Sequence, residues 1–325
     1  MRLSPQRFII AVAGALMAGL AGCSASPGGA YGAQAAHNAV AARAPSRSAP
    51  ASPIPTPSPS PSLTVAGAPS GVRAASGILV DAKSGQVLWS KAPDTERPMA
   101  SITKVMTAYL VIKAGNLNTP IKVPGGVENY VAKYGAEGAG LVPGEELTPL
   151  ELLHGLLMQS GADAAYTFAM DDGPGMSAFV AKMNAAAKQL GMAHTRFTSP
   201  DGLPYPTETS TFSTPADLIK LGQAAMQSSV FRAVVDTVNY NLPAGDGHKA
   251  HSWHDDNSLL KTYPGAVGIK TGFTNVAGHC LLFEAARDGR ALMGVVLDSP
   301  ATGIFAGEDD ATRVLNWGFG LKTTG

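Results

Sequence analysis

Strand patterns at both ends of a helical middle constrain the fold of this chain more than any other feature. Residues 77–90, GILVDAKSGQVLWS, alternate around a Lys83-Ser84-Gly85 turn, which predicts a β-hairpin. Three more strand patterns lie near the C-terminus, at residues 265–273, 278–286 and 291–298. Because the pattern between these ends is helical, we expect an α+β fold, with one antiparallel sheet covered by helices and a helical subdomain.

Two threonines mark where helices begin in that middle region. Residues 148–151, Thr-Pro-Leu-Glu, form a capping box with proline at the first helical position, and residues 214–217, Thr-Pro-Ala-Asp, begin a helix in the same way. Gly191 is predicted to end the helix that runs through FVAKMNAAAKQL. These signals place several helices between the two groups of strands.

The first 22 residues are typical of a signal peptide. Arg2 and Arg7 precede an apolar run, residues 8–20, which at roughly 13 residues is too short to cross a bilayer as an ordinary helix. Residues 20–23, Leu-Ala-Gly-Cys, resemble the lipobox of bacterial lipoproteins, so we expect cleavage before Cys23 and a lipid on its thiol. The alternatives are an ordinary signal peptide cut nearby and a chance cysteine.

Residues 23–72 are predicted to be a disordered linker that begins at the lipidated cysteine. The segment is rich in Pro, Ser and Ala, and it has too few large apolar side chains to bury a core. In extended polyproline II, at about 3.1 Å per residue, it could hold a domain up to ~100 Å from a membrane. We therefore expect an exported, lipid-anchored protein whose folded domain is residues 73–325.

Charge and composition argue against several other classes of function. The chain has 24 basic and 24 acidic residues, so no net field would draw it to nucleic acid. His248, His251 and His254 recur every third residue, but they lie in a polar stretch without acidic or cysteine partners at a usual zinc spacing. We expect a surface loop there, with no metal and no cofactor. Cys280, in an apolar run, is expected to fill the core.

One serine and one lysine are spaced for nucleophilic catalysis. Ser101 precedes Lys104 by three residues at the start of a helical pattern, so the hydroxyl and the amine can share one face. A serine nucleophile with a lysine base needs that arrangement. The motif alone is weak, because Ser258 and Lys261 repeat the spacing. A Ser-His-Asp triad is less favoured, since the chain has no Gly-x-Ser-x-Gly elbow.

Lys270-Thr271-Gly272, on a predicted strand, distinguishes the first motif from the second. The lysine and threonine offer a cation and a hydroxyl to a carboxylate, while the glycine leaves space along the strand. Taken alone, the tripeptide could simply face solvent at a strand end. Ser160 lies between the two motifs, on a predicted loop between helices, where it is either a helix cap or a catalytic group. Asp163 could cap the following helix.

The chain resembles the serine D-alanyl-D-alanine carboxypeptidases, the low-molecular-mass penicillin-binding proteins. Six blocks follow that family in order and spacing: RPMASITKVMTAYLV, LTPLELLHGLLMQSGADAA, GMAHTRFTSPDGLP, STPADLIKLGQAAM, NSLLKTYPGAVGIKTGFTNVAGHCL and VLNWGFG. The resemblance covers nearly all of residues 75–320. It implies the β-lactamase and penicillin-binding-protein fold, a five-stranded sheet with helices on both faces, and an active site between the sheet edge and a helical subdomain.

The resemblance also implies three catalytic roles. Ser101 would be the nucleophile, acylated by the penultimate D-alanine of a peptidoglycan stem peptide, and Lys104 would be the general base. Ser160 would relay the proton to the leaving amine. An ordinary lysine, with a pKa of about 10.4, is neutral only about once in several thousand molecules at pH 7. The pKa of Lys104 must therefore be lowered, by desolvation and by a nearby cation such as Lys270.

Substrate binding is implied by the same resemblance. Lys270 and Thr271 would hold the terminal carboxylate of the peptide beside Gly272. The backbone N–H groups of Ser101 and Phe273 would form the oxyanion hole. The family is inhibited by β-lactams, which acylate the same serine, and its location would be the outer face of the cytoplasmic membrane, facing the cell wall.

Two departures from the family pattern leave alternatives open. Ala162 stands where the family usually has an asparagine, and LDSPATG after the last strand lacks a common arginine. A turnover-impaired peptidoglycan-binding or penicillin-binding protein is therefore one alternative to a carboxypeptidase. A serine β-lactamase is the other, but the Glu-x-x-Leu-Asn segment that class A enzymes use for deacylation does not follow the Ser160 loop.

Overall fold

The computed structural model describes residues 67–300 and 303–321. The predictions for the signal peptide, for Cys23 and for most of the linker lie outside these residues, and so does part of the LDSPATG segment. Within the described ranges, no helix combines the length and the apolar character that crossing a bilayer requires.

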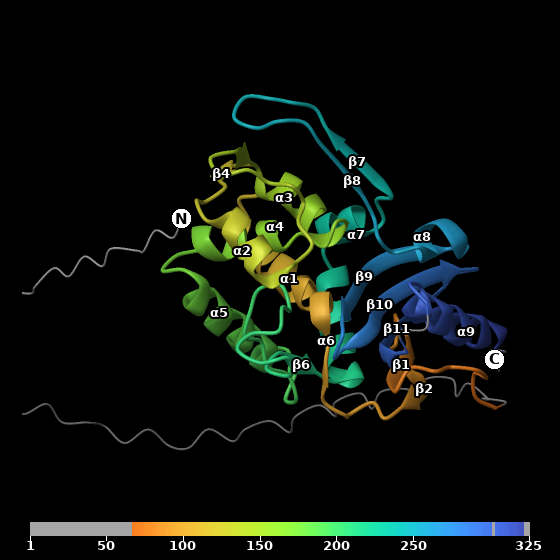
Figure 1. Ribbon diagram of the computed structural model, residues 1–325. Coiled ribbons are helices and arrows are strands. Elements are labelled where there is room, and N and C mark those ends of the chain that lie inside the picture. The colour runs from red at the N-terminus through yellow and green to blue at the C-terminus, as the bar shows by residue number, and fades with distance from the viewer. Residues whose placement is uncertain (1–66, 301–302, 322–325) are drawn as a thin grey trace, which may run out of the picture. The chain divides into compact units, whose positions relative to one another are not determined.

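A five-stranded antiparallel sheet confirms the predicted hairpin and the three predicted C-terminal strands (Figure 1). Its strands are β1 (Ser76–Asp81), β2 (Val87–Lys91), β9 (Ala266–Thr274), β10 (Gly278–Arg287) and β11 (Arg290–Ser299). Their order is β2-β1-β11-β10-β9, so the N-terminal hairpin pairs with the last strand in the sequence. Strand β9 is consequently an edge strand, with one side open to other elements.

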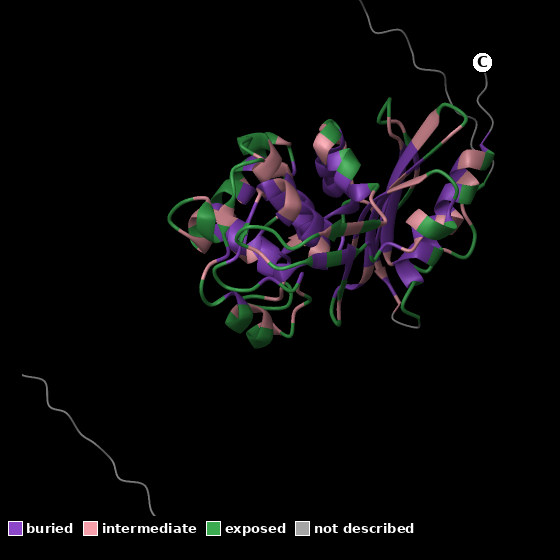
Figure 2. Cartoon of the chain, turned by 90° about the horizontal axis from the view of Figure 1, so that it is seen from above, coloured by how far each residue is buried: buried purple, intermediate pink, exposed green. Residues whose placement is uncertain are grey.

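Helices cover both faces of this sheet, as the α+β prediction expects. Adjacent residues of β11 point to opposite faces, because side chains alternate along a strand. Leu292 is buried with Leu79 on the face that α9 (Ala306–Gly320) covers, and Met293 is buried on the face that α6 (Pro215–Met226) covers. The strands are accordingly buried on both sides (Figure 2).

The remaining helices form the predicted helical part, mainly to one side of the sheet (Figure 1). They are the 3₁₀-helix η1 (Ala100–Thr103) and the α-helices α1 (Lys104–Ala114), α2 (Val127–Tyr134), α3 (Pro149–Leu157), α4 (Ala162–Asp171), α5 (Met176–Gln189), α7 (Ser229–Val235) and α8 (Leu259–Thr262). Three short pairs of strands join them: β3 (Arg97–Pro98) with β6 (Phe212–Ser213), β4 (Ile121–Lys122) with β5 (Glu146–Leu147), and β7 (Asn239–Leu242) with β8 (His251–His254).

The predicted helix boundaries are confirmed at three places. The Thr148 hydroxyl accepts a bond from the Glu151 N–H at 3.2 Å, and the Glu151 carboxylate accepts one from the Thr148 N–H at 2.7 Å. The Thr214 hydroxyl likewise accepts a bond from the Asp217 N–H at 3.1 Å. After α5, Gly191 has a φ of +70°, the left-handed conformation that often follows a helix.

The prediction of a surface loop at the three histidines is wrong for two of them. His251 and His254 lie on β8, where alternate side chains are buried. His251 is buried, with its Nε2 3.2 Å from a Glu145 carboxylate oxygen, and its ring stacks on Trp253. No local sequence pattern could predict this contact, because Glu145 is 106 residues from His251 in the chain. His248 is half-buried, in the turn between β7 and β8.

Candidate active site

Ser101 and Lys104 meet where η1 runs into α1. The Lys104 Nζ donates a hydrogen bond to the Ser101 Oγ at 2.8 Å, so the two groups share a face as predicted. A 3₁₀ turn brings residues i and i+3 directly above one another, and Ser101 lies in such a turn. Ala100, just before it, has a φ of +47°, which is uncommon for a residue with a side chain. The backbone is thus strained next to this serine, as is frequent at functional sites.

The surroundings of Lys104 favour its neutral form. The side chain is 2% exposed, and burial lowers its pKa to about 8. Asp201 raises this pKa and Lys270 lowers it, both less than burial does. The Lys104 Nζ also donates to the Asp201 carbonyl oxygen at 3.0 Å, which fixes the amine beside the serine. At a pKa of about 8, roughly one molecule in ten carries a neutral amine at pH 7.

The turn that supplies this carbonyl packs directly on η1. Gly202 has a φ of +86°, and a Cβ there would lie 1.9 Å from the Ala100 carbonyl oxygen, so only glycine fits. The Asp201 carboxylate accepts a bond from the Tyr130 hydroxyl at 2.7 Å, and burial, followed by this carboxylate, raises the pKa of Tyr130. The turn at residues 201–202 therefore helps to hold Lys104 in place, and Tyr130 of α2 in turn holds this turn.

Ser160 occupies the loop between α3 and α4 and faces the same space. It is 3% exposed and has a φ of +55°, so this position too is held in an uncommon conformation. Asp163 is not the N-cap residue of α4, although its carboxylate accepts a bond from the Ala164 N–H in the first turn of that helix at 2.8 Å. Gly161 is the N-cap residue and makes no side-chain cap bond, whereas Asp163 accepts bonds from the N–H groups of Ala139 and Leu141 at 2.8 and 3.0 Å.

The edge strand β9 brings the Lys270 segment to η1. A Cβ on Gly272 would lie 3.0 Å from both the Ser101 backbone nitrogen and the Met99 carbonyl oxygen. The glycine therefore makes room for the segment that carries Ser101, a neighbour that the sequence prediction did not include. Thr271 and Phe273 also line the site, and Phe273 lies in register with His279 of β10.

Lys270 is buried behind the cavity wall, and acidic side chains lie near enough to influence its charge. Burial lowers its pKa, while Asp256 and Asp255 act in the opposite direction. Its Nζ lies 3.4 Å from the Thr271 hydroxyl. Burial also raises the pKa of Asp255 to about 7 and raises that of Asp256, with Lys270 opposing both shifts. The two carboxylates therefore oppose the loss of charge that burial would cause at Lys270.

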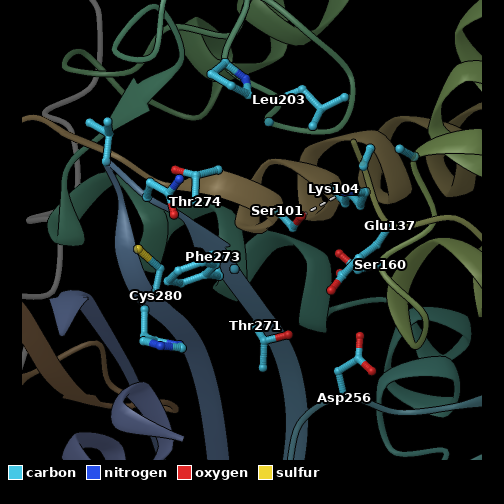
Figure 3. A pocket seen from close by; sticks show the side chains of 18 of the residues that line it. Ser101, Lys104, Glu137, Ser160, Leu203, Asp256, Thr271, Phe273, Thr274 and Cys280 are labelled. Carbon is cyan, nitrogen blue, oxygen red and sulfur yellow. Dashed lines mark hydrogen bonds between the residues drawn. The ribbon is translucent and has the colours of Figure 1, made fainter. Parts of the chain in front are cut away.

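These segments enclose one cavity of about 800 Å³ (Figure 3). Ser101, Lys104 and Ser160 line it from the helical side, and Thr271 and Phe273 line it from β9. All the residues predicted for catalysis therefore gather here, with Lys270 just behind the wall. A cavity of this size accommodates a peptide or a drug-sized ligand.

The repeated serine-lysine motif lies away from the site, and Cys280 lines the cavity without being reactive (Figure 3). Ser258 precedes α8, where it hydrogen-bonds Glu308, and Lys261 is exposed on that helix, so the repeated motif forms no serine-lysine pair. Cys280 is buried as expected. Burial raises the pKa of its thiol to about 12, which leaves it protonated and unreactive near neutral pH.

Sequence reasoning missed several charged groups around the cavity. Four carboxylates line it, from Glu137, Glu208, Asp256 and Glu308, and so does the His279 imidazole. Burial raises the pKa of Glu308 and lowers that of His279. The run Asp-Asp-Asn at residues 255–257 includes an acidic pair, but it follows a stretch that was expected to be a surface loop. The others had no recognisable pattern.

Known proteins resemble this chain over the same segments. A family profile described as D-alanyl-D-alanine carboxypeptidase, peptidase S11, matches residues 63–301. A Streptomyces sp. (strain K15) protein named D-alanyl-D-alanine carboxypeptidase is 39% identical over 262 residues, which are 77% of this chain and 88% of that protein. The Mycobacterium tuberculosis D-alanyl-D-alanine carboxypeptidase DacB2 is 36% identical over 256 residues, 77% of this chain and 83% of the relative.

A solved structure has the same fold. The crystal structure of the Streptomyces K15 DD-transpeptidase superimposes with a TM-score of 0.72 at 37% identity, covering 78% of this chain and 99% of the other. The residues matched by the family profile include Ser101, Lys104, Ser160 and residues 270–273. The similarity thus extends over nearly all of the cavity described above.

Proposed function

The chain belongs to the D-alanyl-D-alanine carboxypeptidase family, peptidase S11, and from that premise we propose that it is a serine hydrolase that removes the terminal D-alanine from peptidoglycan stem peptides. The contact that carries the proposal is the 2.8 Å hydrogen bond between Lys104 and Ser101, inside a cavity large enough for the peptide. β-Lactams would be inhibitors, because they acylate the same serine.

In the acylation step, the Ser101 Oγ attacks the carbonyl carbon of the penultimate D-alanine, and Lys104 takes the hydroxyl proton. The negative oxygen of the tetrahedral intermediate would be held by the N–H groups of Ser101 and Phe273. The proton then passes from Lys104, through the Ser160 hydroxyl, to the leaving amine. The peptide C–N bond breaks, D-alanine leaves and an ester on Ser101 remains.

In the deacylation step, water attacks the ester carbonyl. Lys104, neutral again, takes a proton from the water and returns one to the Ser101 Oγ as the ester bond breaks. An amine in place of water would give a transpeptidation product. Throughout, the Thr271 hydroxyl would bind the terminal carboxylate of the substrate, and Lys270, next to Thr271 behind the wall, would attract it by its charge.

Of the two alternatives, a β-lactamase is less well supported, since it needs a fast route for deacylation that no glutamate motif provides in this sequence. A turnover-impaired binding protein is disfavoured by the intact Ser101 and Lys104 contact and by the carboxypeptidase names of the relatives. Ala162 and the missing arginine in LDSPATG keep this alternative open.

One experiment separates the three activities. The soluble domain is incubated with a labelled penicillin and, separately, with a peptide that ends in D-Ala-D-Ala. A carboxypeptidase gives a long-lived adduct on Ser101 and free D-alanine. Rapid loss of the adduct with penicillin hydrolysis would indicate a β-lactamase, and an enzyme that forms an adduct without releasing D-alanine would be turnover-impaired.

We further propose that a lipid on Cys23 anchors the domain, through the residue 23–72 linker, to the outer face of the cytoplasmic membrane. The lipobox-like Leu-Ala-Gly-Cys at residues 20–23 supports this proposal. The natural chain should sediment with membranes, while Cys23→Ser should appear in the soluble exported fraction. Equal membrane association of the two chains would rule out the lipid anchor.

A further inference from the structure

Glu137 places a carboxylate on the wall of the cavity beside Ser160 (Figure 3). The residue is exposed to the cavity and to solvent. Its charge reaches both lysines of the site: burial lowers the pKa of each, and Glu137 is among the carboxylates that partly oppose it. The reaction described above gives this side chain no role.

The backbone that carries Glu137 is fixed to the loop of Ser160. The Glu137 carbonyl oxygen accepts a hydrogen bond from the Ala162 N–H at 2.9 Å. Two residues further on, the Ala139 N–H donates to the Asp163 carboxylate at 2.8 Å, and the Ala139 carbonyl accepts from the Trp253 indole N–H at 2.8 Å. The backbone of this segment is therefore a fixed part of the wall, from which the Glu137 side chain projects.

The hydrogen-bonding character of this wall follows from Ala162 and Glu137 together. Ala162 is buried, lines the cavity and has no polar side-chain atom. Glu137, whose backbone is bonded to that of Ala162, also lines the cavity, and its carboxylate when ionised only accepts hydrogen bonds. An asparagine at residue 162 would instead present an amide that can donate. This wall is thus complementary to a hydrogen-bond donor on the substrate.

We propose that Glu137 determines substrate specificity by binding an ammonium group on the residue that precedes D-alanyl-D-alanine in the peptide. This inference rests on the proposed function. The terminal carboxylate would lie at Lys270 and Thr271, and the scissile carbonyl at Ser101, so the preceding residue lies further along the cavity. A lysine-like side chain on that residue is long enough to extend from the peptide backbone toward the wall that carries Glu137.

The charge of the cavity supports an ammonium group rather than a neutral donor. Four carboxylates line the cavity, against the basic side chains of Lys104 and His279 and the buried Lys270 behind the wall. A positive group on the substrate would offset this excess of acidic groups. A charge-assisted hydrogen bond is also about twice as strong as a neutral one.

The test compares two peptides that differ in one charge. Nα-acetyl-L-Lys-D-Ala-D-Ala keeps its free ε-ammonium group, and the Nα,Nε-diacetyl peptide does not. We expect the natural protein to show a kcat/KM about tenfold higher for the free-amine peptide, and Glu137→Gln to bring the ratio close to one. If Glu137 acted only on the pKa values of the lysines, its removal would change kcat/KM for both peptides by the same factor. Such an effect cancels in the ratio of the two kcat/KM values.

Glu208→Gln is the matched control, since Glu208 is an exposed carboxylate elsewhere on the same cavity, and it should keep the natural ratio. A natural ratio near one, or a ratio that survives Glu137→Gln, would overturn the proposal. If neither peptide is cleaved, the proposed function has failed instead. The ratio of the two dissociation constants, measured by NMR titration, then tests Glu137 without turnover.

Discussion

At the scale of single residues, the two lysines of the site are separated in role by their neighbours. Both are buried, and burial lowers the pKa of each. Lys104 donates a hydrogen bond to the Ser101 hydroxyl and lines the cavity. Lys270 lies behind the cavity wall, and the charges of Asp255 and Asp256 act on it. The first is placed to exchange a proton with the nucleophile, and the second to remain a cation.

The pH dependence of acylation follows from the pKa of Lys104. Because the neutral amine is the base and burial brings this pKa to about 8, the rate of penicillin acylation should rise with pH and level off above about 8. Lys104→Ala should lower the rate by at least ~10², while Lys261→Ala, in the repeated motif, should leave the profile unchanged. A rate that still rises at pH 10 would contradict the assignment. Stopped-flow measurement of the acylation rate across roughly pH 6–10 gives this pH dependence.

A second prediction at this scale concerns Ala162. Ala162→Asn should leave the fold and the penicillin adduct intact and raise peptide turnover by a few-fold, the value of about one added hydrogen bond to the substrate. D-Alanine release from the diacetyl peptide checks it. Unchanged or lower turnover would mean that the loop works without this contact. Ser160→Ala, which removes the proposed proton relay, should cost much more than the Ala162 change gains.

At the scale of elements, the site depends on a clamp between the Ser160 loop and residues 137–141. Asp163, at the start of α4, holds this segment through the N–H groups of Ala139 and Leu141, and it is 3% exposed. The carboxylate satisfies two backbone donors that would otherwise be buried without partners. It thereby joins two walls of the cavity.

Removal of the clamp should affect both stability and activity. Asp163→Ala removes the acceptor of these two donors and of the Ala164 N–H, and it should lower the free energy of unfolding by about 2–4 kcal/mol, with a loss of peptide turnover. Thr148→Ala, which removes the capping box of α3, should cost about 1 kcal/mol and spare turnover. Urea unfolding and D-alanine release measure the two effects. Equal losses of turnover in the two variants would show that α3, rather than the clamp, controls the site.

At the scale of the whole molecule, the N-terminal segment is tied to the last helix. Asp310 of α9 is fully buried and accepts bonds from the Arg73 and Ala74 N–H groups at 2.9 and 2.7 Å and from the Ser299 hydroxyl at 2.8 Å. Strand β1 then enters the sheet between β2 and β11. The fold therefore closes with residues from both ends of the described chain.

Truncation tests this arrangement. A chain that begins at residue 67 should fold and react with penicillin at the rate of the longer protein, because it keeps the Asp310 contacts and β1. A chain that begins at residue 82 lacks an inner strand and should not fold. Circular dichroism and penicillin labelling decide the matter. Folding of the shorter chain would contradict the role given to β1.

Local patterns made most of the fold predictable. The hairpin, the three C-terminal strands and both threonine caps depend on neighbouring residues, and the structure confirms them. The errors share one cause, a partner that is distant in the sequence. His251 is buried against Glu145, and Asp163 bonds residues 139–141 in addition to the first turn of its own helix. No local pattern identifies Glu137 or the carbonyl of Asp201, which tertiary packing brings to the cavity.

The most direct test of the central claim is to trap the acyl-enzyme. The soluble domain is mixed with the diacetyl peptide or with penicillin, quenched in acid and digested, and the modified residue is identified by mass spectrometry. We predict an ester on Ser101 together with release of D-alanine from the peptide. The ester should be absent from Ser101→Ala and retained in Ser258→Ala. Modification of another residue, or D-alanine release by Ser101→Ala, would contradict the account.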